Sequence, residues 1–521
     1  MRTLFPLCFY VFSVSAMSPA TVELVKARLK DAAQKSWELG TRSQALLELE
    51  SPSVSVFTAT SIPGSPASLN QTSLKLATNA AKLAFTNGQL DDVVGLSHEI
   101  LASKQPGTLP LMKDGSSADP ASNGVGMIVA NWTEAQGSDF EAAARDQLTW
   151  LLSHVPRSSK GAISHRNSEV QLWSDYIYMV PPFLAYYGAS TSNRTLLTEA
   201  HNQIKLYRDV LRDKNTGLWQ HIRQGSFEDR GLWSTGNGWA AMGVMRVAAT
   251  IRAAGYSSDF TAELKDFESW TEEILDGMWP LLTDQGLFYN YADNTDTFLD
   301  GASTALMAAS TYRAAVMFNN TKWIEQAEKV YGIIGGTDSN STAPASTVVS
   351  ASSESTPTAR KHRMVREVHH RVQLSHLKHG SNPAPAVLLS THQPHTRATK
   401  HITSEGWLTP VVDPHSFKVI GQHSAEGQAF ILMMYTARND YLASQKLKLG
   451  NGGAANVIGM STTPSSGLNT TAGGLNGVGN VGAGLNSGSG TTEERTNADY
   501  KASFEVGTIV GAVGAVLAWV V

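Results

Sequence analysis

Apolar positions recur every three or four residues along most of this chain, and strand-like alternation is scarce. Such spacing predicts amphipathic helices, because residues three and four apart lie on one helical face. The connections are rich in Gly, Asn, Asp and Ser, so consecutive antiparallel helix pairs are expected. The predicted helices span residues 20–48, 72–88, 92–104, 119–131, 138–155, 169–188, 193–213, 234–254, 258–280, 300–317, 320–332 and 423–445.

A loop motif recurs between the predicted helices, which indicates an internal repeat. Its copies follow short polar turns and begin at Gly161, Gly217, Gly286 and Gly406, at intervals of 56, 69 and 120 residues. The repeating unit is a helical hairpin. The last interval is about twice the others, so it requires either a missing unit or an insertion.

Residues 333–400 favour an insertion, because Ser, Thr, Pro, Arg and His accumulate there and helical periodicity disappears. Removing these 68 residues reduces the last interval to 52 residues, which restores the spacing of the repeat. We therefore expect a disordered insertion, for which a translated intron is one origin. The segment holds 7 of the 15 histidines, but without a scaffold it is not expected to bind a metal.

Residues 1–16 have the features of a secretory signal peptide. Arg2 precedes the apolar run Leu4–Val14, and the small residues Ser15 and Ala16 suit a cleavage site. The only cysteine, Cys8, lies inside this segment, so the mature chain is expected to lack disulfides. Sequons that fit a secreted glycoprotein begin at Asn70, Asn131, Asn193, Asn319, Asn340 and Asn469.

The C-terminal part of the chain resembles a lipid-anchor signal. Residues 446–497 are rich in Gly, Asn, Ser and Thr, which predicts a flexible stalk, and residues 498–521 end in the apolar run Val506–Val521. Small residues, a polar spacer and a short apolar tail occur in the order of a GPI-attachment signal. A tail anchor or a hydrophobic terminal stub is the alternative. Residues 17–445 would then form one large domain, interrupted by the insertion.

The composition excludes some partners. The chain has 521 residues, of which 42% are apolar and 17% charged, so it can bury a large core. A formal net charge of −4 and a pI near 6.4 provide no basic surface for nucleic acid or for an anionic membrane. Contact with a membrane is therefore expected only through the C-terminal lipid anchor. The oligomeric state stays open.

The predicted helix 169–188 contains the best candidate for catalytic chemistry. Helical spacing would place Leu172, either Asp175 or Tyr176, and Met179 on one face, so a carboxyl group would lie among bulky apolar and aromatic side chains. Such surroundings raise the pKa of a carboxyl group toward the range of a general acid. The alternative is an ordinary Asp near a helix start.

Two histidines end equivalent copies of the loop motif. His165 and His221 should therefore emerge on the same rim of a barrel built from the repeat. A structural histidine that donates to a loop carbonyl is the alternative for each of them. Two histidines without a carboxylate at a fixed short spacing do not form a metal signature, so neither a metal nor another cofactor is expected.

Residues 233–239 begin another predicted helix with aromatic residues around two glycines. Trp233 and Trp239 suit a sugar platform, because indole faces stack on the C–H surface of pyranose rings. Two core tryptophans at a helix start are the alternative. Tyr289, Tyr291 and Trp407 leave the same two interpretations open.

Four segments, in order along the chain, resemble motifs of the unsaturated rhamnogalacturonyl hydrolases, glycoside hydrolase family 105. Residues 173–185 (WSDYIYMVPPFLA) resemble W-x-D-x-x-Y-M-x-x-P-F-L-A, and residues 233–239 (WSTGNGW) resemble a second signature. Residues 301–307 (GASTALM) and 424–430 (SAEGQAF) resemble two more. The similarity covers residues 30–445 apart from the insertion, and we expect a fungal-type member of the family.

The resemblance implies an all-α fold, an (α/α)6 barrel of helical hairpins, and a six-hairpin glycosidase without a metal. It implies hydration of a 4,5-unsaturated uronic acid at the nonreducing end of a pectin fragment. Asp175 matches the catalytic Asp, and Asp119 matches the second active-site Asp in D-x-x-x-x-G. The matched substrate-binding residues are His165, His221, Trp173, Trp233, Asn237 and Trp239.

One departure from the family pattern affects the expected substrate. The family has an Arg in W-x-R-[GA]-x-G-W, where this chain has Thr235. A Thr cannot supply the fixed charge that binds a carboxylate. Another cation replaces the Arg, or the sugar differs, or activity is lost. A mannanase-like (α/α)6 cell-wall glycosidase and an inactive glycan-binding surface protein are therefore alternatives, although the Asp-Asp pair of the former is missing before Asp175.

Overall fold

The chain forms two concentric rings of six α-helices. The computed structural model describes residues 17–65, 71–133, 139–336 and 401–450. The inner ring consists of α2 (Ser36–Glu50), α5 (Gly124–Trp132), α8 (Pro181–Ser190), α10 (Ser234–Ala253), α12 (Gly301–Phe318) and α14 (Ala425–Gly450). The outer ring consists of α1 (Pro19–Ala32), α4 (Asp91–Ser103), α6 (Asp139–Ser153), α9 (Arg194–Leu211), α11 (Thr261–Met278) and α13 (Ile324–Gly335).

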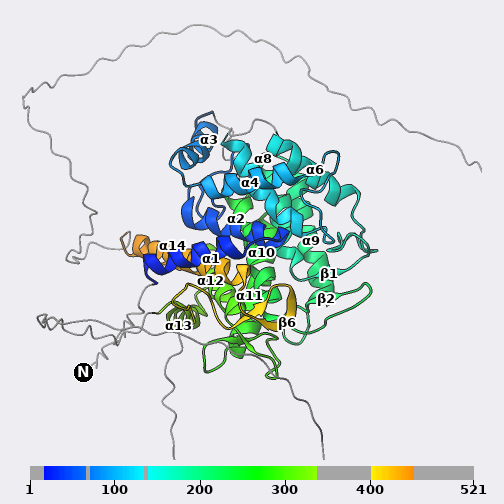
Figure 1. The fold of residues 1–521 in the computed structure, drawn as a ribbon. Helices are drawn as coiled ribbons and strands as arrows, with labels where there is room; N and C mark the ends of the chain where they lie inside the picture. Colours follow the sequence, from blue (N-terminus) through cyan, green and yellow to red (C-terminus); the bar gives the residue numbers. More distant parts are fainter. Residues whose placement is uncertain (1–16, 66–70, 134–138, 337–400, 451–521) are drawn as a thin grey trace, which may run out of the picture. The chain divides into compact units, whose positions relative to one another are not determined.

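Contacts between consecutive inner helices close the ring, because α14 packs against α2 as well as against α12. Each inner helix before α14 packs against the outer helix that follows it, as α8 does against α9 and α12 against α13, so the chain alternates between the two rings. The fold is therefore the expected (α/α)6 barrel. Figure 1 shows α3 (Gln71–Thr86) at the edge of the molecule, outside these rings.

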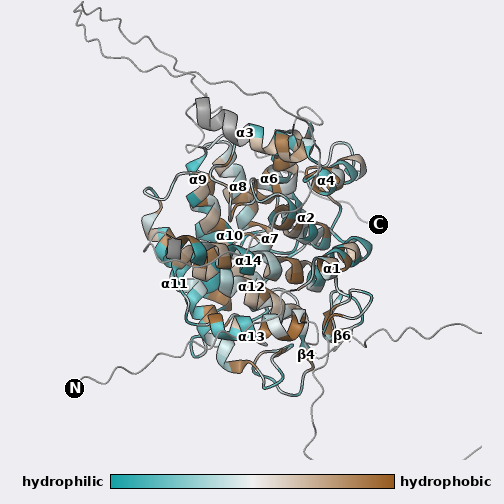
Figure 2. Cartoon of the chain, turned by 90° about the vertical axis from the view of Figure 1, so that its left-hand side faces the viewer, coloured by the Kyte–Doolittle hydropathy of each residue, from teal (hydrophilic) through white to brown (hydrophobic). Residues whose placement is uncertain are grey.

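Inner and outer helices differ in how many of their side chains are buried. In α10 every residue except Arg252 is buried, so this inner helix is enclosed on all sides. In α9 the buried residues recur at three- and four-residue spacing, as expected of an amphipathic outer helix. Figure 2 shows hydrophilic residues along the outer helices α9 and α11. No helix in the described ranges is long and apolar enough to cross a membrane.

Short elements occupy the connections. Three antiparallel strand pairs are present among the described residues: β1 (Leu172–Trp173) with β2 (Ile222–Arg223), β3 (Phe288–Tyr289) with β4 (Leu299–Asp300), and β5 (Val411–Asp413) with β6 (Ser416–Gly421). The remaining short elements are α7 (Tyr176–Met179) and the 3-10 helices η2 (Asp119–Asn123) and η3 (Trp279–Leu281).

The four motif glycines are equivalent in three dimensions. Gly161, Gly217, Gly286 and Gly406 all have positive φ, between 77° and 96°, in loops that lead from an outer helix to the next inner helix. Glycine adopts this conformation without the steric cost that a Cβ imposes. The loops therefore lie at the end of the barrel where the inner helices begin.

Two helix predictions were wrong in detail. Residues 20–48 form two helices, because the Glu38 carboxylate accepts hydrogen bonds from the backbone N–H groups of Gln34 and Lys35, both at 2.8 Å, where α2 begins. Residues 169–188 start as a loop and a strand, and the main helix α8 begins at Pro181. Proline is favoured in a first helical turn and disfavoured in a helix interior.

Two domain boundaries also shift. Helix α13 continues to Gly335, so the first three residues of the predicted insertion 333–400 are helical. Helix α14 continues to Gly450, so the barrel domain extends five residues past its predicted end at residue 445. The signal peptide at 1–16, the rest of the insertion at 337–400, and the stalk and anchor signal after residue 450 lie outside the described residues.

Candidate active site

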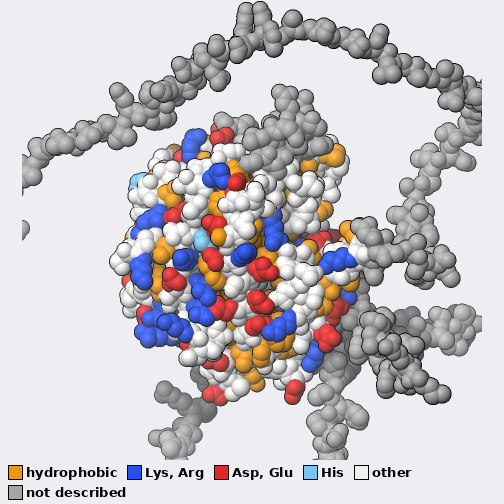
Figure 3. Space-filling model, turned by 180° about the vertical axis from the view of Figure 1, so that it is seen from behind, with side chains coloured by type: hydrophobic (Ala, Val, Ile, Leu, Met, Phe, Trp, Pro, Cys, Tyr) orange, Lys and Arg blue, Asp and Glu red, His pale blue; other side chains and the backbone are white. Residues whose placement is uncertain are grey.

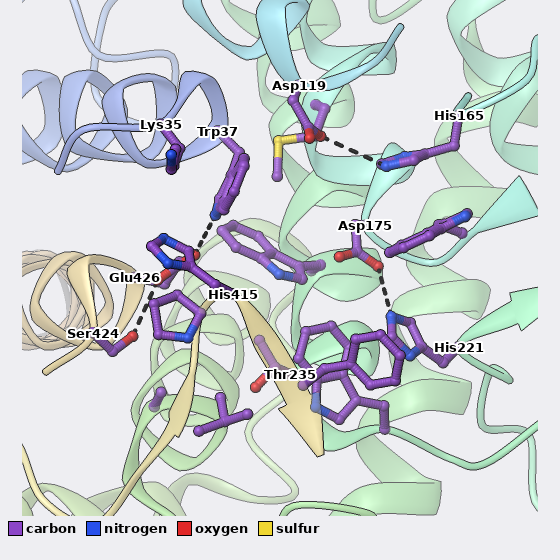
Figure 4. A pocket seen from close by; sticks show the side chains of 18 of the residues that line it. Lys35, Trp37, Asp119, His165, Asp175, His221, Thr235, His415, Ser424 and Glu426 are labelled. Carbon is purple, nitrogen blue, oxygen red and sulfur yellow. Dashed lines mark hydrogen bonds and ion pairs between the residues drawn. The ribbon is translucent and has the colours of Figure 1, made fainter. Parts of the chain in front are cut away.

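A cavity of about 450 Å³ lies at the end of the barrel where the inner helices begin. Its volume is within the range of roughly 300–1,000 Å³ that is typical of ligand sites. Residues in the first turns of α2, η2, α10, α12 and α14 contribute to its lining, together with Asp175 before α7. Figure 4 shows Asp119 and Asp175 with their histidines on one side of the cavity and Glu426 with Trp37 on the other.

Asp175 lies directly before α7, and its carboxyl group lines the cavity. Ser174 Oγ donates to Asp175 Oδ2 at 3.2 Å, and His221 Nε2 lies 3.6 Å from the same oxygen. Burial raises the pKa of Asp175, and the smaller opposing effects of His221 and of hydrogen bonds do not reverse this. The group therefore keeps its proton to a higher pH than an exposed Asp.

Helix α10 packs closely against the segment that carries Asp175 and holds this segment in place. A Cβ at Gly236 would lie 2.3 Å from Ser174 Oγ, so only glycine fits where α10 passes the Asp175 segment. Gly236 therefore allows α10 to pack closely against the segment that carries Asp175.

The orientation of His221 is set by the loop that follows β2. Asp229 Oδ2 lies 3.0 Å from His221 Nδ1, and the Tyr291 hydroxyl donates to the same oxygen. Burial alone would raise the pKa of Asp229, but hydrogen bonds from His221, Tyr291 and the Gly231 amide lower it to about 2. Asp229 is therefore ionised and accepts the Nδ1 proton. His221 Nε2 faces Asp175, and this atom has no hydrogen-bond partner among the described residues.

Asp119 and His165 form a second carboxyl–imidazole pair in the cavity. Asp119 Oδ1 lies 3.7 Å from His165 Nε2. Burial raises the pKa of Asp119 well above its ordinary value, and the negative charges of Asp114 and Asp175 raise it further. Burial lowers the pKa of His165 well below its ordinary value, so its ring is neutral. The cavity thus holds two carboxyl groups that are both predisposed to carry a proton.

Three tryptophans line the cavity beside these acids. Trp173 stacks on His165 with ring centroids 4.7 Å apart, and its indole N–H donates to Gln171 at 2.7 Å. Trp233 lies against His221, and Trp239 is almost fully buried yet lines the cavity. Aromatic walls with fixed rings suit the apolar faces of sugars.

Asn237 does not line the cavity, which corrects its predicted role in substrate binding. Its side chain accepts from the Trp219 amide at 2.8 Å and donates to the carbonyls of Trp219 and Trp233, both at 3.0 Å. In the equivalent loops, Gln203 accepts from the Ile163 amide, and Gln428 accepts from the Leu408 amide. Asn237 therefore fixes a repeated loop, and both N–H groups of its amide donate to backbone carbonyls.

A third carboxyl group at the far side of the cavity was not predicted. Glu426 accepts from the Trp37 indole at 2.5 Å and from the Ser424 hydroxyl at 3.1 Å. Burial and the negative charge of Glu38 raise the pKa of Glu426 to about 7. His415, on the turn between β5 and β6, lies 3.2 Å from Glu38 and ties this hairpin to α2. Glu426 belongs to one of the quoted motifs, but nothing in the motif indicates that α14 starts at the cavity.

The residue at the family's Arg position is engaged with protein. Thr235 Oγ1 donates to Asp300 Oδ2 at 3.3 Å, and Asp300 caps α12 by accepting from the Ser303 amide at 2.8 Å. Two cations line the cavity elsewhere, Arg166 beside the Asp119 end and Lys35 beside Trp37. Neither cation forms an ion pair with another residue of the described segments. No sequence motif indicated that Arg166 or Lys35 would line the cavity.

The described residues also bear on metal binding, on the distribution of surface charge, and on the positions of Tyr291 and Trp407. Within residues 17–65, 71–133, 139–336 and 401–450 there is no group of three or more His, Cys, Asp or Glu that could hold a metal ion. On the face shown in Figure 3, basic and acidic side chains are interspersed rather than gathered by sign. Tyr291 contacts Asp229, whereas Trp407 stacks on His423 away from the cavity.

Comparisons with known proteins agree with the fold. The model of Glycosyl Hydrolase Family 88 matches residues 104–371, which is just over half of the chain, and two parts of the match (134–138 and 337–371) lie outside the described residues. No protein with a curated description matches the sequence.

Two similar solved structures share the fold at low sequence identity. One is described as a possible member of the GH105 family from Salmonella enterica serovar Paratyphi A, with 14% identity, a TM-score of 0.51, and coverage of 81% of this chain and 93% of that one. The other has the same description and comes from Klebsiella pneumoniae, with 14% identity, a TM-score of 0.51, and coverage of 84% and 96%.

Proposed function

Because this chain belongs to Glycosyl Hydrolase Family 88 and is a glycoside hydrolase, we propose that it removes a 4,5-unsaturated uronic acid from the nonreducing end of pectin-derived oligosaccharides. The observation that carries this proposal is Asp175, a carboxyl group with a raised pKa that faces the unpaired Nε2 of His221 across 3.6 Å. A buried acid that keeps its proton is what protonation of a vinyl ether requires.

The proposed reaction adds one water molecule across the C4=C5 double bond. Asp175 donates its proton to C4, a water molecule bonds to C5, and Asp175 takes up the proton that this water loses. The hemiketal at C5 opens to a ketone, and the hemiacetal left at C1 releases the next sugar. His221 lies beside the Asp175 carboxyl group and positions it, while Asp119 and His165 hold the water from the other side.

The direction of the inner helices supports an anionic substrate. Five of them, α2, α5 with its preceding η2, α10, α12 and α14, begin at the cavity. Each helix N-terminus carries roughly half a positive charge from its unpaired N–H groups. These partial positive charges stabilise a sugar carboxylate in the cavity, even though Thr235 supplies no charge.

We expect Arg166 to take the role that the missing Arg has in the family. Replacing Arg166 with Ala should raise KM for an unsaturated uronide by about 10-fold or more, because a charge-assisted hydrogen bond contributes roughly 1.5–3 kcal/mol. Arg166→Lys should retain part of the affinity. Steady-state kinetics measures both, with Lys35→Ala as the comparison, since Lys35 lies at the other end of the cavity. Equal KM values for Arg166→Ala and the unaltered protein would show that another group binds the carboxylate of the substrate.

Turnover of a panel of unsaturated uronides by the full chain tests the proposed activity. The ultraviolet absorbance of the conjugated double bond should disappear as each substrate is hydrated. A protein that leaves every unsaturated uronide intact, but releases sugar from a neutral glycan, would contradict the proposal and favour a mannanase-like activity.

We also propose that the protein is secreted and held at the cell surface by a GPI anchor, which rests on residues 1–16 and 498–521. The three described sequons support this arrangement. Asn131, Asn193 and Asn319 all lie at the end of the barrel where inner helices finish, away from the cavity. Glycans there would leave the cavity open.

Sequon occupancy is a measurable consequence of secretion. Asn193 and Asn319 are exposed at helix ends, so both should carry N-glycans after expression in a eukaryotic secretory host. Asn131 should not, because it is half-buried in α5 and the buried Thr133 donates its hydroxyl to Ala130. Mass spectrometry of peptides treated with glycosidase in heavy-oxygen water reports each site. A secreted protein without glycans on Asn193 and Asn319 would contradict this prediction.

A further inference from the structure

Phe227 is a large apolar side chain that remains exposed beside the cavity. Its side chain is 49% exposed, and its ring lies edge-on to Trp173 with centroids 6.0 Å apart and an interplanar angle of 82°. Trp173 lines the cavity next to Asp175. Phe227 therefore stands at the rim, where solvent meets the catalytic side of the cavity.

The loop that carries Phe227 is fixed by hydrogen bonds. Gln171 donates to the Phe227 carbonyl at 2.8 Å, and the Ser226 amide and hydroxyl both donate to Glu169 at 2.6 Å. Gln224 and Gly225 both have positive φ, 67° and 78°. A non-glycine residue in this region is strained and persists only where its surroundings hold it. The ring is thus presented to solvent by a well-supported loop.

The same hydrogen bonds connect Phe227 to the catalytic groups. Gln171 uses its amide nitrogen for the Phe227 carbonyl and its amide oxygen for the Trp173 indole. Asp229, two residues after Phe227, orients His221. On another segment, Phe417 of β6 lines the cavity and meets Trp173 edge-on, with centroids 6.4 Å apart and an interplanar angle of 84°.

The charges around Phe227 are paired with one another. Glu228 accepts from Arg223 at 3.2 Å and from Arg230 at 2.8 Å, and Glu169 accepts from Ser226. No unpaired cation on the loop from Arg223 to Arg230 is left to bind a second carboxylate. The surface that Phe227 offers is apolar, and its own loop presents no free charge to a second sugar.

We infer that Phe227 and Phe417 form the binding platform for the sugar next to the cleaved bond, and that this sugar is neutral. Its C–H face packs on the exposed Phe227 ring while the unsaturated uronate occupies the cavity beside Asp175. The inference rests on the proposed function and adds the residue that selects the leaving sugar. Phe227 acts by binding this sugar rather than in the proton transfer.

Kinetics on two substrates with the same unsaturated uronate tests the platform. One is a disaccharide with a neutral second sugar, and the other is the methyl glycoside, which lacks that sugar. Phe227→Ala should lower kcat/KM for the disaccharide about 3- to 10-fold through KM, the size expected of one aromatic contact. The methyl glycoside should be unaffected. Leu24→Ala, which removes another exposed apolar side chain on the outer helix α1, is the matched control and should change neither.

Two outcomes overturn the inference: an equal loss of kcat/KM on both substrates, or no loss on the disaccharide. If the unaltered protein hydrates neither substrate, the proposed activity fails, and titration calorimetry with the saturated disaccharide still tests the platform. Binding by the unaltered protein that Phe227→Ala weakens supports the platform. Binding that the substitution leaves unchanged, or no binding at all, overturns it.

Discussion

Asp175→Asn is expected to lower kcat on unsaturated uronides by about 10³-fold, within the range that general acid catalysis contributes. The amide has the size of the carboxyl group and can keep the hydrogen bond from Ser174, but it cannot deliver a proton to C4. Steady-state kinetics measures the loss, and circular dichroism with thermal unfolding shows whether the fold is retained.

Asp209→Asn is the matched control for this substitution. Asp209 is exposed on the outer helix α9 and does not line the cavity, so the same chemical change there should leave kcat unchanged. An Asp175→Asn protein that keeps more than a tenth of the kcat of the unaltered protein would remove Asp175 from the role of catalytic acid.

The same carboxyl group should determine how the rate depends on pH. Asp175 must be protonated to act, and burial raises its pKa, so kcat is highest below that pKa and falls as the pH rises through it. An exposed Asp would lose its proton at lower pH, which would shift the fall toward acid. A pH–rate profile of kcat measures the position of this limb. A rate that increases over the same interval would indicate that the ionised carboxylate is the active form.

Arg313→Met is expected to lower the free energy of unfolding by about 3–5 kcal/mol, because it leaves the buried carboxylate of Glu48 without its cation. Arg313, on α12, is 2% exposed and binds Glu48 of α2 at 2.7 Å and Asp440 of α14 at 2.5 Å. These contacts join the first and last inner helices through a third one. Loss of the cation therefore weakens the closure of the inner ring.

Denaturant unfolding followed by circular dichroism measures this effect. The exposed ion pair of Arg194 with Asp259 provides the matched control, and Arg194→Met should change the free energy of unfolding by less than about 1 kcal/mol. Adding Glu48→Gln to Arg313→Met should recover part of the loss, since it removes one unpaired charge. An Arg313→Met protein as stable as the Arg194→Met protein would show that the buried network contributes little.

The architecture could be predicted from local patterns because each helical hairpin is encoded by residues that are neighbours in sequence. The loop glycines recur because every hairpin needs a left-handed residue at the same place, and all four have positive φ. The same repeat placed His165 and His221 at one end of the barrel, and both line the cavity. The ordered motifs around Asp175 and Asp119 marked the two carboxyl groups that the fold brings into this cavity.

Local patterns failed where a distant segment decides the outcome. Residues 169–188 have helical spacing, but β1 pairs with β2 some 50 residues later, and Pro181 is where α8 starts. Asn237 looked like a sugar ligand in its motif, yet the Trp219 loop uses its amide completely. Only the folded chain shows which of these polar groups remain free.

The sequence by itself determined the helical hairpins, their repeated loops and the two carboxyl groups to test first, because periodicity and left-handed glycines are local properties. Tertiary structure alone decided the electrostatics of the cavity. Glu426, Arg166 and the loop that carries Phe227 and Asp229 come from separate segments of the chain, and their roles depend on distances that no spacing along the chain contains. A pKa responds to burial and to nearby charge, and both arise only when the rings close.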